Sequence, residues 1–595
     1  MTTTSLRLLG TALALLAVHP LTAAKPAAAA HAPRPNILLV VTDDQGYWDV
    51  HAAGNDKIDT PTLDRLAAEG VWLDRFYACP VCAPTRAGLL TGRYYLRTGV
   101  YNTRFGGDTM SLDETTLAEV VKQAGYRTGL FGKWHLGHYA GYRPHERGFD
   151  ETLTFYEGHL DRYDYPEPLW HNDEPVEARG YVTDLFTDAA IDFVRTAGKR
   201  PFFCYLAYNA PHSPHSLGDS HDEQPRGDAM IEKYLKRDLP LREARIYAMV
   251  ERIDQNLARL LNVLDELQLS DNTLVIFMSD NGGVSKAFKA GIRGNKAQVY
   301  EGGVRVPCFV RWPGRFPAGT KVGAMASHLD VLPTICDLLE LPLPDKQPID
   351  GRSILDLLNN GAGDSPHEYL CHTWNRYYPD PDNNWAISDG RYKALGRNVK
   401  SSKAEKASAE LYDLESDPGE TTDLATSHPR IVKRLRNEYV RWFNDVTGGQ
   451  RYRPVPIPVG NPSDNPVEIQ ASWAQHEGDG VSYVFRGYHW DTLEGWKRPG
   501  TAATWLLQVE RPGLYEVRLS YGRSPQSEGG TLRLSAGEAA VELRPKATVT
   551  AEVFRTVTAG TLRLPAGRTE LKAEAVETGS GELMRLNRIW LRHIE

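Results

Sequence analysis

Cysteine is rare in this chain of 595 residues, which contains six, with none in the last third of the sequence. Small domains that depend on disulfide bonds carry cysteines at much higher density. The scattered pattern therefore excludes a disulfide framework as the basis of the fold. At this length the chain can form one large domain and at least one smaller domain around hydrophobic cores.

An excess of basic residues is also missing. Lys and Arg total 68, Asp and Glu total 76, and the formal net charge is -8. A general nucleic-acid-binding protein needs basic residues to neutralise phosphates, so we expect no nucleic-acid partner. An anionic substrate is not excluded, because local arginines and lysines decide its binding.

Long hydrophobic runs are absent as well. The apolar run at residues 8–18 is too short to span a bilayer, follows Arg7 and ends at His19-Pro20. Small residues come next, and this order is typical of a secretory signal peptide, which we place at residues 1–30. A buried N-terminal helix is the weaker alternative. We therefore expect an exported protein, periplasmic or secreted, with no integral membrane segment in the mature chain.

Three uninterrupted apolar runs, at residues 36–41, 201–207 and 274–278, predict buried strands. Such runs are typical of parallel strands with both sheet faces covered. Amphipathic patterns at residues 116–123 and 244–267 predict helices that lie between these strands in the sequence. The first part of the chain therefore predicts an α/β fold.

Polar residues follow each of these strands, namely Asp43, Asp44, His212, Asp280 and Asn281. Ligands bind beyond the carboxyl ends of strands in open α/β sheets, so we expect these side chains to gather. The Asp43-Asp44 and Asp280-Asn281 pairs offer hard oxygen donors, which suit Ca²⁺ or Mg²⁺ rather than zinc. Either pair alone could simply cap a turn, but two pairs at equivalent strand ends favour a metal site.

The pattern changes after about residue 368. Short strand patterns and a helix at residues 429–446 predict a smaller α+β subdomain, and alternating apolar residues near the C-terminus predict a β-sandwich. We therefore expect four parts after the signal peptide: an α/β domain at 35–362, an α+β subdomain at 363–450, a proline-rich linker at 451–465 and a β-sandwich module at 466–595.

Cys82 lies in the segment Cys82-Ala83-Pro84-Thr85-Arg86, which runs into a helix-like stretch. A thiol close to an arginine is a candidate nucleophile beside an anion-binding site. Cys79 and Cys82 also form a Cys-x-x-Cys pair, which in a compact βαβ context indicates redox chemistry. Because the downstream residues and the metal pairs explain more, we expect Cys79 to be a packing residue.

The ordered set of motifs resembles the formylglycine-dependent (type I) sulfatases of the alkaline phosphatase superfamily, over about residues 35–446. The motifs are Cys82–Arg86 with Leu90-Thr91-Gly92-Arg93, then Gly132–Gly137 around Lys133-Trp134-His135, then Asp280-Asn281-Gly282, and finally Lys296–Pro307. The resemblance implies an alkaline-phosphatase-like, mostly parallel mixed sheet flanked by helices, with an α+β subdomain that completes the active site of the catalytic domain.

The resemblance also implies a role for each site residue. Cys82 would be oxidised to formylglycine by a formylglycine-generating enzyme, and its hydrate would supply the nucleophilic oxygen. One Ca²⁺ would be bound by Asp43, Asp44, Asp280, Asn281 and the modified Cys82. Arg86 would hold the nucleophile. Lys133, His212 and Lys296 would bind sulfate oxygens, with His212 as acid for the leaving group and His135 as base for sulfate release.

A carbohydrate sulfatase is the leading hypothesis, with a sulfated polysaccharide or oligosaccharide as the substrate. A phosphonate monoester or phosphodiester hydrolase of the same superfamily and a noncatalytic glycan-binding protein are the alternatives. Two groups of residues could contact sugars, although core packing explains the module aromatics equally well. In the catalytic region they are His159, Arg162, His372, Trp374 and Arg376, and in the module they are Trp473, Tyr488, Trp490 and Trp496.

Overall fold

The computed structural model of the protein describes residues 1–2, 34–104, 106–164, 166, 168–217, 229–376, 378–396, 409–450, 452, 454–475, 480–486 and 490–595. The expected signal peptide, apart from residues 1–2, and Tyr488 lie outside this set. Every helix within the set is too short or too polar to cross a bilayer.

A ten-stranded mixed sheet forms the centre of the large domain, and its middle strands are parallel. Antiparallel pairs occur where β9 joins β2 and β8, and at β5 and β6. The strand order is β10 (Thr320–Ser327), β2 (Val71–Tyr77), β9 (Cys308–Arg311), β8 (Thr273–Ser279), β1 (Asn36–Thr42), β7 (Phe202–Ala207), β3 (Arg127–Lys133), β4 (Glu151–Phe155), β5 (Leu169–His171), β6 (Glu174–Val176). The predicted strands and mixed sheet are confirmed.

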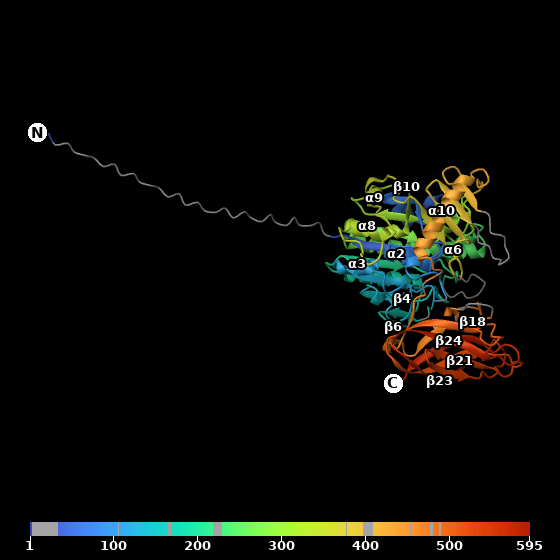
Figure 1. The fold of residues 1–595 in the computed structure, drawn as a ribbon. Helices are drawn as coiled ribbons and strands as arrows, with labels where there is room; N and C mark the ends of the chain where they lie inside the picture. The colour runs from blue at the N-terminus through green and yellow to red at the C-terminus, as the bar shows by residue number, and fades with distance from the viewer. Residues whose placement is uncertain are drawn as a thin grey trace. The chain divides into compact units, whose positions relative to one another are not determined.

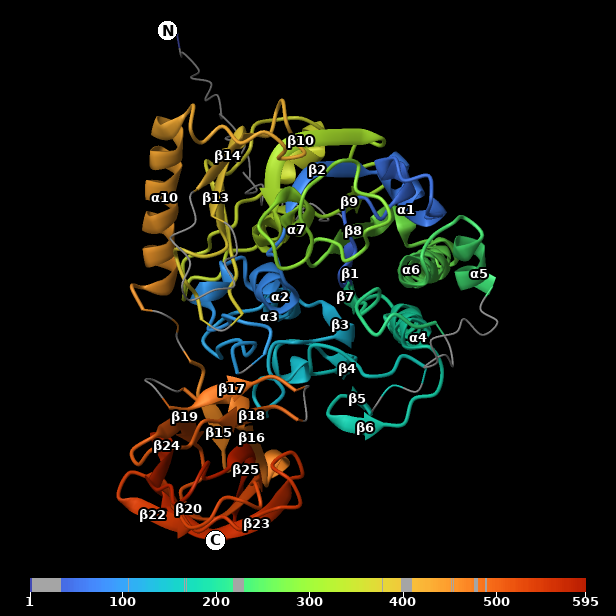
Figure 2. The same ribbon diagram turned by 90° about the vertical axis from the view of Figure 1, so that its right-hand side faces the viewer.

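Helices cover both faces of the sheet, as the apolar runs predicted. Side chains of β1 alternate between two cores: Leu38 and Val40 belong to one, and Ile37, Leu39 and Val41 to the other. Figure 2 shows α4, α5 and α6 on one side of the sheet and α2 and α3 on the other. The first side holds α1 (Pro61–Glu69), α4 (Val182–Thr196), α5 (Ala229–Leu235) and α6 (Leu241–Glu266); the second holds α2 (Cys82–Thr91), α3 (Leu117–Gln123), α8 (Val331–Leu338) and α9 (Leu355–Asn360).

The smaller α+β subdomain has a four-stranded antiparallel sheet and one long helix. The strands are β11 (Leu370–Thr373), β12 (Trp385–Ser388), β13 (Tyr392–Gly396) and β14 (Glu410–Asp413). Helix α10 (Pro429–Thr447) lies beside this sheet in Figure 2, with the rings of Tyr439 and Trp385 5.0 Å apart. The predicted strand and helix patterns are confirmed.

The C-terminal module is a two-sheet sandwich, drawn in orange to red in Figure 1. One sheet has β15 (Ile457–Val459), β19 (Ala502–Val509), β24 (Gly567–Glu577), β21 (Thr531–Ala536) and β22 (Ala539–Leu543). The other has β17 (Ser482–Val484), β18 (Thr492–Glu494), β25 (Arg585–His593), β20 (Gly513–Gly522) and β23 (Arg555–Leu564), with β16 (Val467–Gln470) paired to β25. Tyr515, Val517, Leu519 and Tyr521 point into the core as their alternation predicted.

Three residues of the expected linker, Ile457–Val459, instead form β15, which pairs in parallel with β19. Ile457 and Val459 are buried in the core of the sandwich. Strand β15 is at the edge of its sheet, where proline is tolerated although it cannot donate a backbone hydrogen bond. This edge position explains how a proline-rich segment takes part in the sheet.

A buried ion triad connects the large domain to the α+β subdomain. Lys393 Nζ of β13 is 2.9 Å from Glu301 Oε1, at the start of α7 (Glu301–Val304), and 2.9 Å from Glu420 Oε1. The Glu301 backbone N–H donates to Glu420 Oε2 at 2.7 Å. Because all three side chains are excluded from solvent, removing the lysine would leave two buried carboxylates without their cation.

We expect Lys393→Met to lower the free energy of unfolding by about 3–5 kcal/mol, the usual effect of breaking a buried ion pair from one side. Urea unfolding followed by circular dichroism measures the change. Lys122→Met is the matched control, because Lys122 pairs with Asp150 at the surface and its loss should cost about 1 kcal/mol or less. Equal effects of the two substitutions would contradict the structural role of the triad.

Candidate active site

Four neighbouring strands of the sheet, β8, β1, β7 and β3, end at the candidate site. Thr42 at the end of β1 pairs with Ser279 at the end of β8, so the residues that follow, Asp43 and Asp280, lie side by side. Lys133 is the last residue of β3, and His212 follows β7. Adjacent parallel strands thus bring together residues that lie up to 237 positions apart in the sequence.

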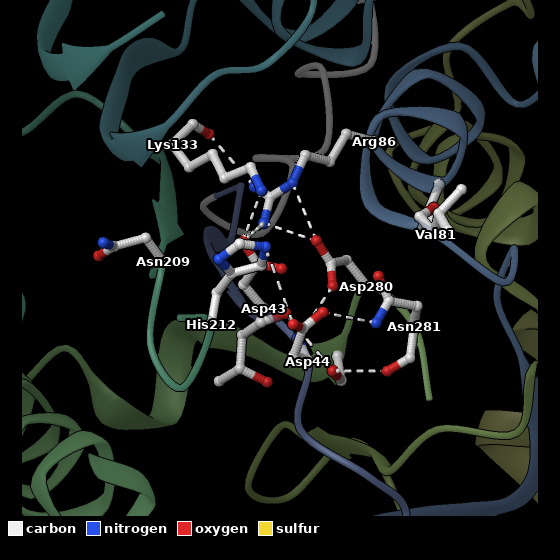
Figure 3. A network of polar contacts seen from close by, with 12 residues as sticks. Asp43, Asp44, Val81, Arg86, Lys133, Asn209, His212, Asp280 and Asn281 are labelled. Atoms are coloured by element: carbon white, nitrogen blue, oxygen red, sulfur yellow. Dashed lines mark hydrogen bonds and ion pairs between the residues drawn. The ribbon is translucent and has the colours of Figure 1, made fainter. Parts of the chain in front are cut away.

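The acidic and amide side chains form one buried cluster. The Asp44 backbone N–H donates to Asp280 Oδ1 at 3.3 Å, and Asn281 Nδ2 donates to Asp44 Oδ1 at 2.9 Å. Ligand atoms of Asp43, Cys82 and Asp280 lie within 4.8 Å of one another, as do those of Asp43, Asp44 and His212. Figure 3 shows Arg86 and Lys133 on one side of this cluster and Asn281 on the other.

Three cationic side chains face the three carboxylates. Lys133 Nζ is 2.6 Å from Asp43 Oδ2, and Lys296 Nζ is 2.5 Å from Asp44 Oδ1. Arg86 donates to Asp280 Oδ2 from Nε at 3.1 Å and from Nη2 at 2.8 Å. A lysine at position 86 could not reproduce this two-pronged contact, because its ammonium group is a single donor centre.

Two oxygens of the cluster are left without hydrogen bonds. Asp43 Oδ1 and Asn281 Oδ1 are buried, and neither has a hydrogen-bond partner among the described residues. A buried acceptor without a partner is costly, and a cation would satisfy it. Oxygen donors of this kind are the preferred ligands of a hard divalent cation, so the residues fit such an ion.

The pKa values of the two neighbouring carboxyl groups move in opposite directions. Burial alone would raise the pKa of Asp43, but the charges of Lys133, His212, Lys296 and Arg86 together outweigh burial and hold that pKa well below its ordinary range. Burial and the charge of Asp43 raise the pKa of Asp280, although Arg86 acts against them. Two carboxylates this close cannot both stay charged unless nearby cations compensate, which is a second reason why a divalent ion suits the site.

Cys82 is the first residue of α2, and Arg86 lies one turn later on the same face. Pro84 is tolerated in this first turn because its missing N–H would have no partner within the helix. The N-terminal end of a helix favours negative charge, which suits an attacking oxygen or thiolate at position 82.

Cys79 is free and does not pair with Cys82. Burial raises the pKa of the Cys79 thiol to about 12, and its Sγ lies 3.6 Å from His328 Nε2 in the hydrophobic core. The structure thus places Cys79 as a packing residue, as expected.

The two candidate histidines both enter the site with one ring nitrogen held by a backbone carbonyl. His135 Nε2 contacts Thr103 O at 3.0 Å, and its buried Nδ1 has no hydrogen-bond partner among the described residues. His212 Nδ1 contacts Ser213 O at 2.8 Å, and its Nε2 is 3.9 Å from Asp44 Oδ2. The carbonyl contacts fix the tautomer of each neutral ring, leaving one basic nitrogen.

Burial lowers the pKa of both imidazoles. The pKa of His135 falls to about 3, with Lys133 as the next cause, and that of His212 falls to about 4, with Lys296 as the next cause. His135 is therefore neutral near pH 7, and its Nδ1 has no hydrogen-bond partner among the described residues. His212 needs a nearby anion, such as a bound substrate, to favour its protonated form.

A pocket of about 460 Å³ opens over Cys82, His135, His212 and Lys296. This size is within the usual range for ligand sites, about 300–1,000 Å³. None of the described residues that line the pocket is acidic, so the pocket favours an anion.

Some of the residues predicted to contact sugars line the pocket in the structure, and others do not. Trp374 and Arg376 line the pocket, whereas His372 is buried against Tyr77 and His159 lines a neighbouring pocket. Arg162 is exposed outside both pockets. Trp496 is in the sandwich core, Trp473 packs on Tyr139, and Trp490 is exposed beside Phe554. The pocket residues that the sequence did not predict include Arg104, Tyr483 and Phe485, and no local pattern marks these three.

Two family models match the chain. One, described as Sulfatase, matches residues 35–341. The second, described as N-sulphoglucosamine sulphohydrolase, C-terminal, matches residues 294–443. Both therefore end before the sandwich module.

Curated relatives agree with the family models. N-acetylgalactosamine-6-sulfatase of Canis lupus familiaris is 34% identical over 410 residues, which are 62% of this chain and 72% of the relative. Human arylsulfatase A is 33% identical over 471 residues, covering 68% of this chain and 86% of the relative.

Solved structures show the same fold. The crystal structure of Ps i-CgsB in complex with k-i-k-neocarrahexaose has a TM-score of 0.62 and 29% identity, over 71% of this chain and 95% of that chain. A phosphonate monoester hydrolase of Agrobacterium radiobacter has a TM-score of 0.51 and 22% identity, over 70% and 96%, and at this identity the likeness concerns the fold alone.

Binding of a divalent cation to this site can be measured without an activity assay. We expect CaCl₂ added to chelator-treated protein to raise the free energy of unfolding by about 2.7 kcal/mol at a hundredfold excess over Kd. Asp43→Asn should lose most of this gain, because it removes charge and one of the unpaired oxygens. Asp59→Asn, at a surface ion pair, is the control and should keep the gain. Thermal unfolding with and without the ion reports the result, and no shift in the parent protein would contradict the site.

Proposed function

Because the chain belongs to the sulfatase family, and is a sulfuric ester hydrolase, we propose that it hydrolyses sulfate esters of a sulfated polysaccharide or oligosaccharide with a nucleophile made from Cys82. The observation that carries the proposal is the position of Cys82. Its Sγ lies within 4.8 Å of carboxylate oxygens of Asp43 and Asp280, and Cys82 also lines a basic pocket. The names of the relatives, an N-acetylgalactosamine-6-sulfatase and a protein crystallised with neocarrahexaose, support a glycan as substrate.

We further propose that a formylglycine-generating enzyme oxidises Cys82 in an exported chain, periplasmic or secreted. The Sγ atom then marks where the hydroxyl oxygens of the formylglycine hydrate would be. Asp43, Asp44, Asp280, Asn281 and the modified Cys82 would hold one Ca²⁺. When bound, the ion would supply positive charge that stabilises an oxyanion.

We propose the following roles for the remaining residues, which their positions around Cys82 support. One hydroxyl of residue 82, held by Arg86, loses its proton to water and attacks sulfur through its oxygen, and the bond from sulfur to the sugar oxygen breaks. Lys133, Lys296 and His212 bind the sulfate oxygens, and His212 gives a proton to the leaving oxygen, because the bound anion raises the proton affinity of its imidazole. His135 then takes the proton from the second hydroxyl, so that sulfate leaves and the aldehyde re-forms.

The nucleophile can be tested by mass spectrometry of the Cys82 peptide. We expect the CH₂SH group of residue 82 to be replaced by CHO in active protein, and Cys82→Ala to abolish sulfate release. Cys79→Ser is the matched control and should keep both the modification and the activity, because Cys79 is a core residue. Fully active protein with an unmodified thiol at residue 82, or sulfate release that survives Cys82→Ala, would overturn this mechanism. A parent protein that releases no sulfate, and whose glycan binding survives Cys82→Ala, would favour a noncatalytic glycan-binding role.

The acid role of His212 predicts a dependence on the leaving group. A sugar alkoxide is a poor leaving group and needs a proton, whereas a nitrophenolate leaves without one. We expect His212→Ala to slow hydrolysis of a sugar sulfate by about 10²–10⁴-fold, the usual contribution of general acid catalysis, and that of nitrophenyl sulfate much less. An equal reduction of the rate on both substrates would contradict the acid role and would indicate that His212 only binds sulfate.

The alternative hypothesis is a phosphonate monoester or phosphodiester hydrolase, because the same nucleophile and cation can act on phosphorus. One structural neighbour has the first of these activities in its name. The support for this alternative is the fold alone, whereas the sequence relatives are sulfatases. Comparison of kcat/KM for nitrophenyl sulfate and nitrophenyl phosphate esters separates the two, since a preference for phosphorus would reverse the assignment.

A further inference from the structure

The sandwich module reaches into the candidate active site. Strand β17 pairs with β18 at the edge of its sheet, with Tyr483 opposite Leu493. Tyr483 and the next residue but one, Phe485, line the same pocket as Cys82 and Lys296. The pocket wall therefore includes two aromatic residues from a part of the chain that lies beyond both family models.

The position of this aromatic pair is fixed within the module. Asp491 accepts a hydrogen bond from the Tyr483 hydroxyl and another from the backbone N–H of Arg486 at 2.7 Å. Asn587 Nδ2 of β25 donates to the carbonyl of Asp491 at 2.9 Å. The residues on either side of Phe485 are thus attached to the central strand of the sheet.

The module itself is joined to the segment that follows His135. Tyr139 belongs to the hydrophobic core of the module, and its hydroxyl donates to Glu468 O at 2.5 Å. The Ala140 backbone N–H donates to Asp464 Oδ2 at 2.6 Å. Because these contacts are buried or partly buried, the module is held against the catalytic domain rather than attached by a free linker.

Phe485 has the exposure and the surroundings of a ligand contact. It is 56% exposed although it is a large apolar side chain, and the guanidinium carbon of Arg104 is 4.9 Å from its ring centroid. A second pair of the same kind, Arg376 over Trp374 at 5.3 Å, lines the same pocket. Aromatic faces bind the apolar C–H face of a sugar ring, and arginines bind its acidic substituents.

We propose that Tyr483 and Phe485 form the stacking face of a sugar subsite inside the active-site pocket. The subsite binds the sugar ring adjacent to the one that carries the scissile sulfate. The acidic substituents of the glycan face Arg104 and Arg376. The inference rests on the proposed function, because it takes the reacting sulfate to lie over Cys82. The module is then a determinant of substrate choice and contributes to the active site directly.

The test compares Phe485→Ala with the parent protein on two substrates. We expect kcat/KM for a sulfated oligosaccharide to fall by about tenfold, mainly through KM, because one stacking contact is lost. Nitrophenyl sulfate carries no sugar, so its kcat/KM should fall by a much smaller factor. Phe485→Tyr should retain most of the parent kcat/KM for the oligosaccharide, because it keeps an aromatic ring at this position. Phe554→Ala is the matched control, a phenylalanine of the same module that does not line the pocket.

Binding separates this inference from the proposed function. Calorimetric titration of the oligosaccharide into Cys82→Ala and into Cys82→Ala with Phe485→Ala should show about tenfold weaker binding for the double variant. If the parent protein hydrolyses no sulfate ester, the proposed function fails, but this titration still decides the subsite. Equal affinities in the titration, or equal losses on both substrates, would overturn the subsite.

Discussion

The buried contact between Arg86 and Asp280 is the interaction on which the site depends. One guanidinium group of α2 donates to Asp280 after β8, to the Lys133 carbonyl of β3 at 3.2 Å and to the Tyr205 hydroxyl of β7 at 3.5 Å. It thus fixes the helix that carries Cys82 against three strands. The carboxylates could not be buried together without such cations, because an uncompensated buried charge is very costly.

This contact explains the spacing of the Cys82–Arg86 segment. Residues four apart in a helix lie on one face, so the turn that directs Arg86 toward Asp280 also directs Cys82 toward Asp43. Three non-glycine residues around the site, Asp44, His135 and Ala297, have φ values of 74°, 60° and 69°. Backbone conformations of this kind are tolerated where the surrounding contacts determine them, and here they turn side chains toward the same small volume.

The sequence predicted the sheet and the charged cluster because both follow from local patterns. Apolar runs marked β1, β7 and β8, and the polar residues after them could only meet at one edge of a parallel sheet. It could not predict that Tyr483 and Phe485 reach the pocket, because that contact joins segments hundreds of residues apart and depends on how two domains pack. Residue type alone also could not predict which tryptophans are accessible to a ligand. Trp496 is in a core and Trp490 is exposed, although the two lie on either side of the same strand, β18.

The packing of the module changes how the chain divides into functional parts. The segment after His135 supplies Tyr139 and Tyr142 to the core of the sandwich, so the base of the proposed reaction and the docking surface of the module lie on one short stretch. Removing the module would expose these tyrosines and open one wall of the pocket. A binding module on a flexible linker raises only the local concentration of substrate, whereas a module that forms a wall of the pocket can select among substrates at the point of reaction.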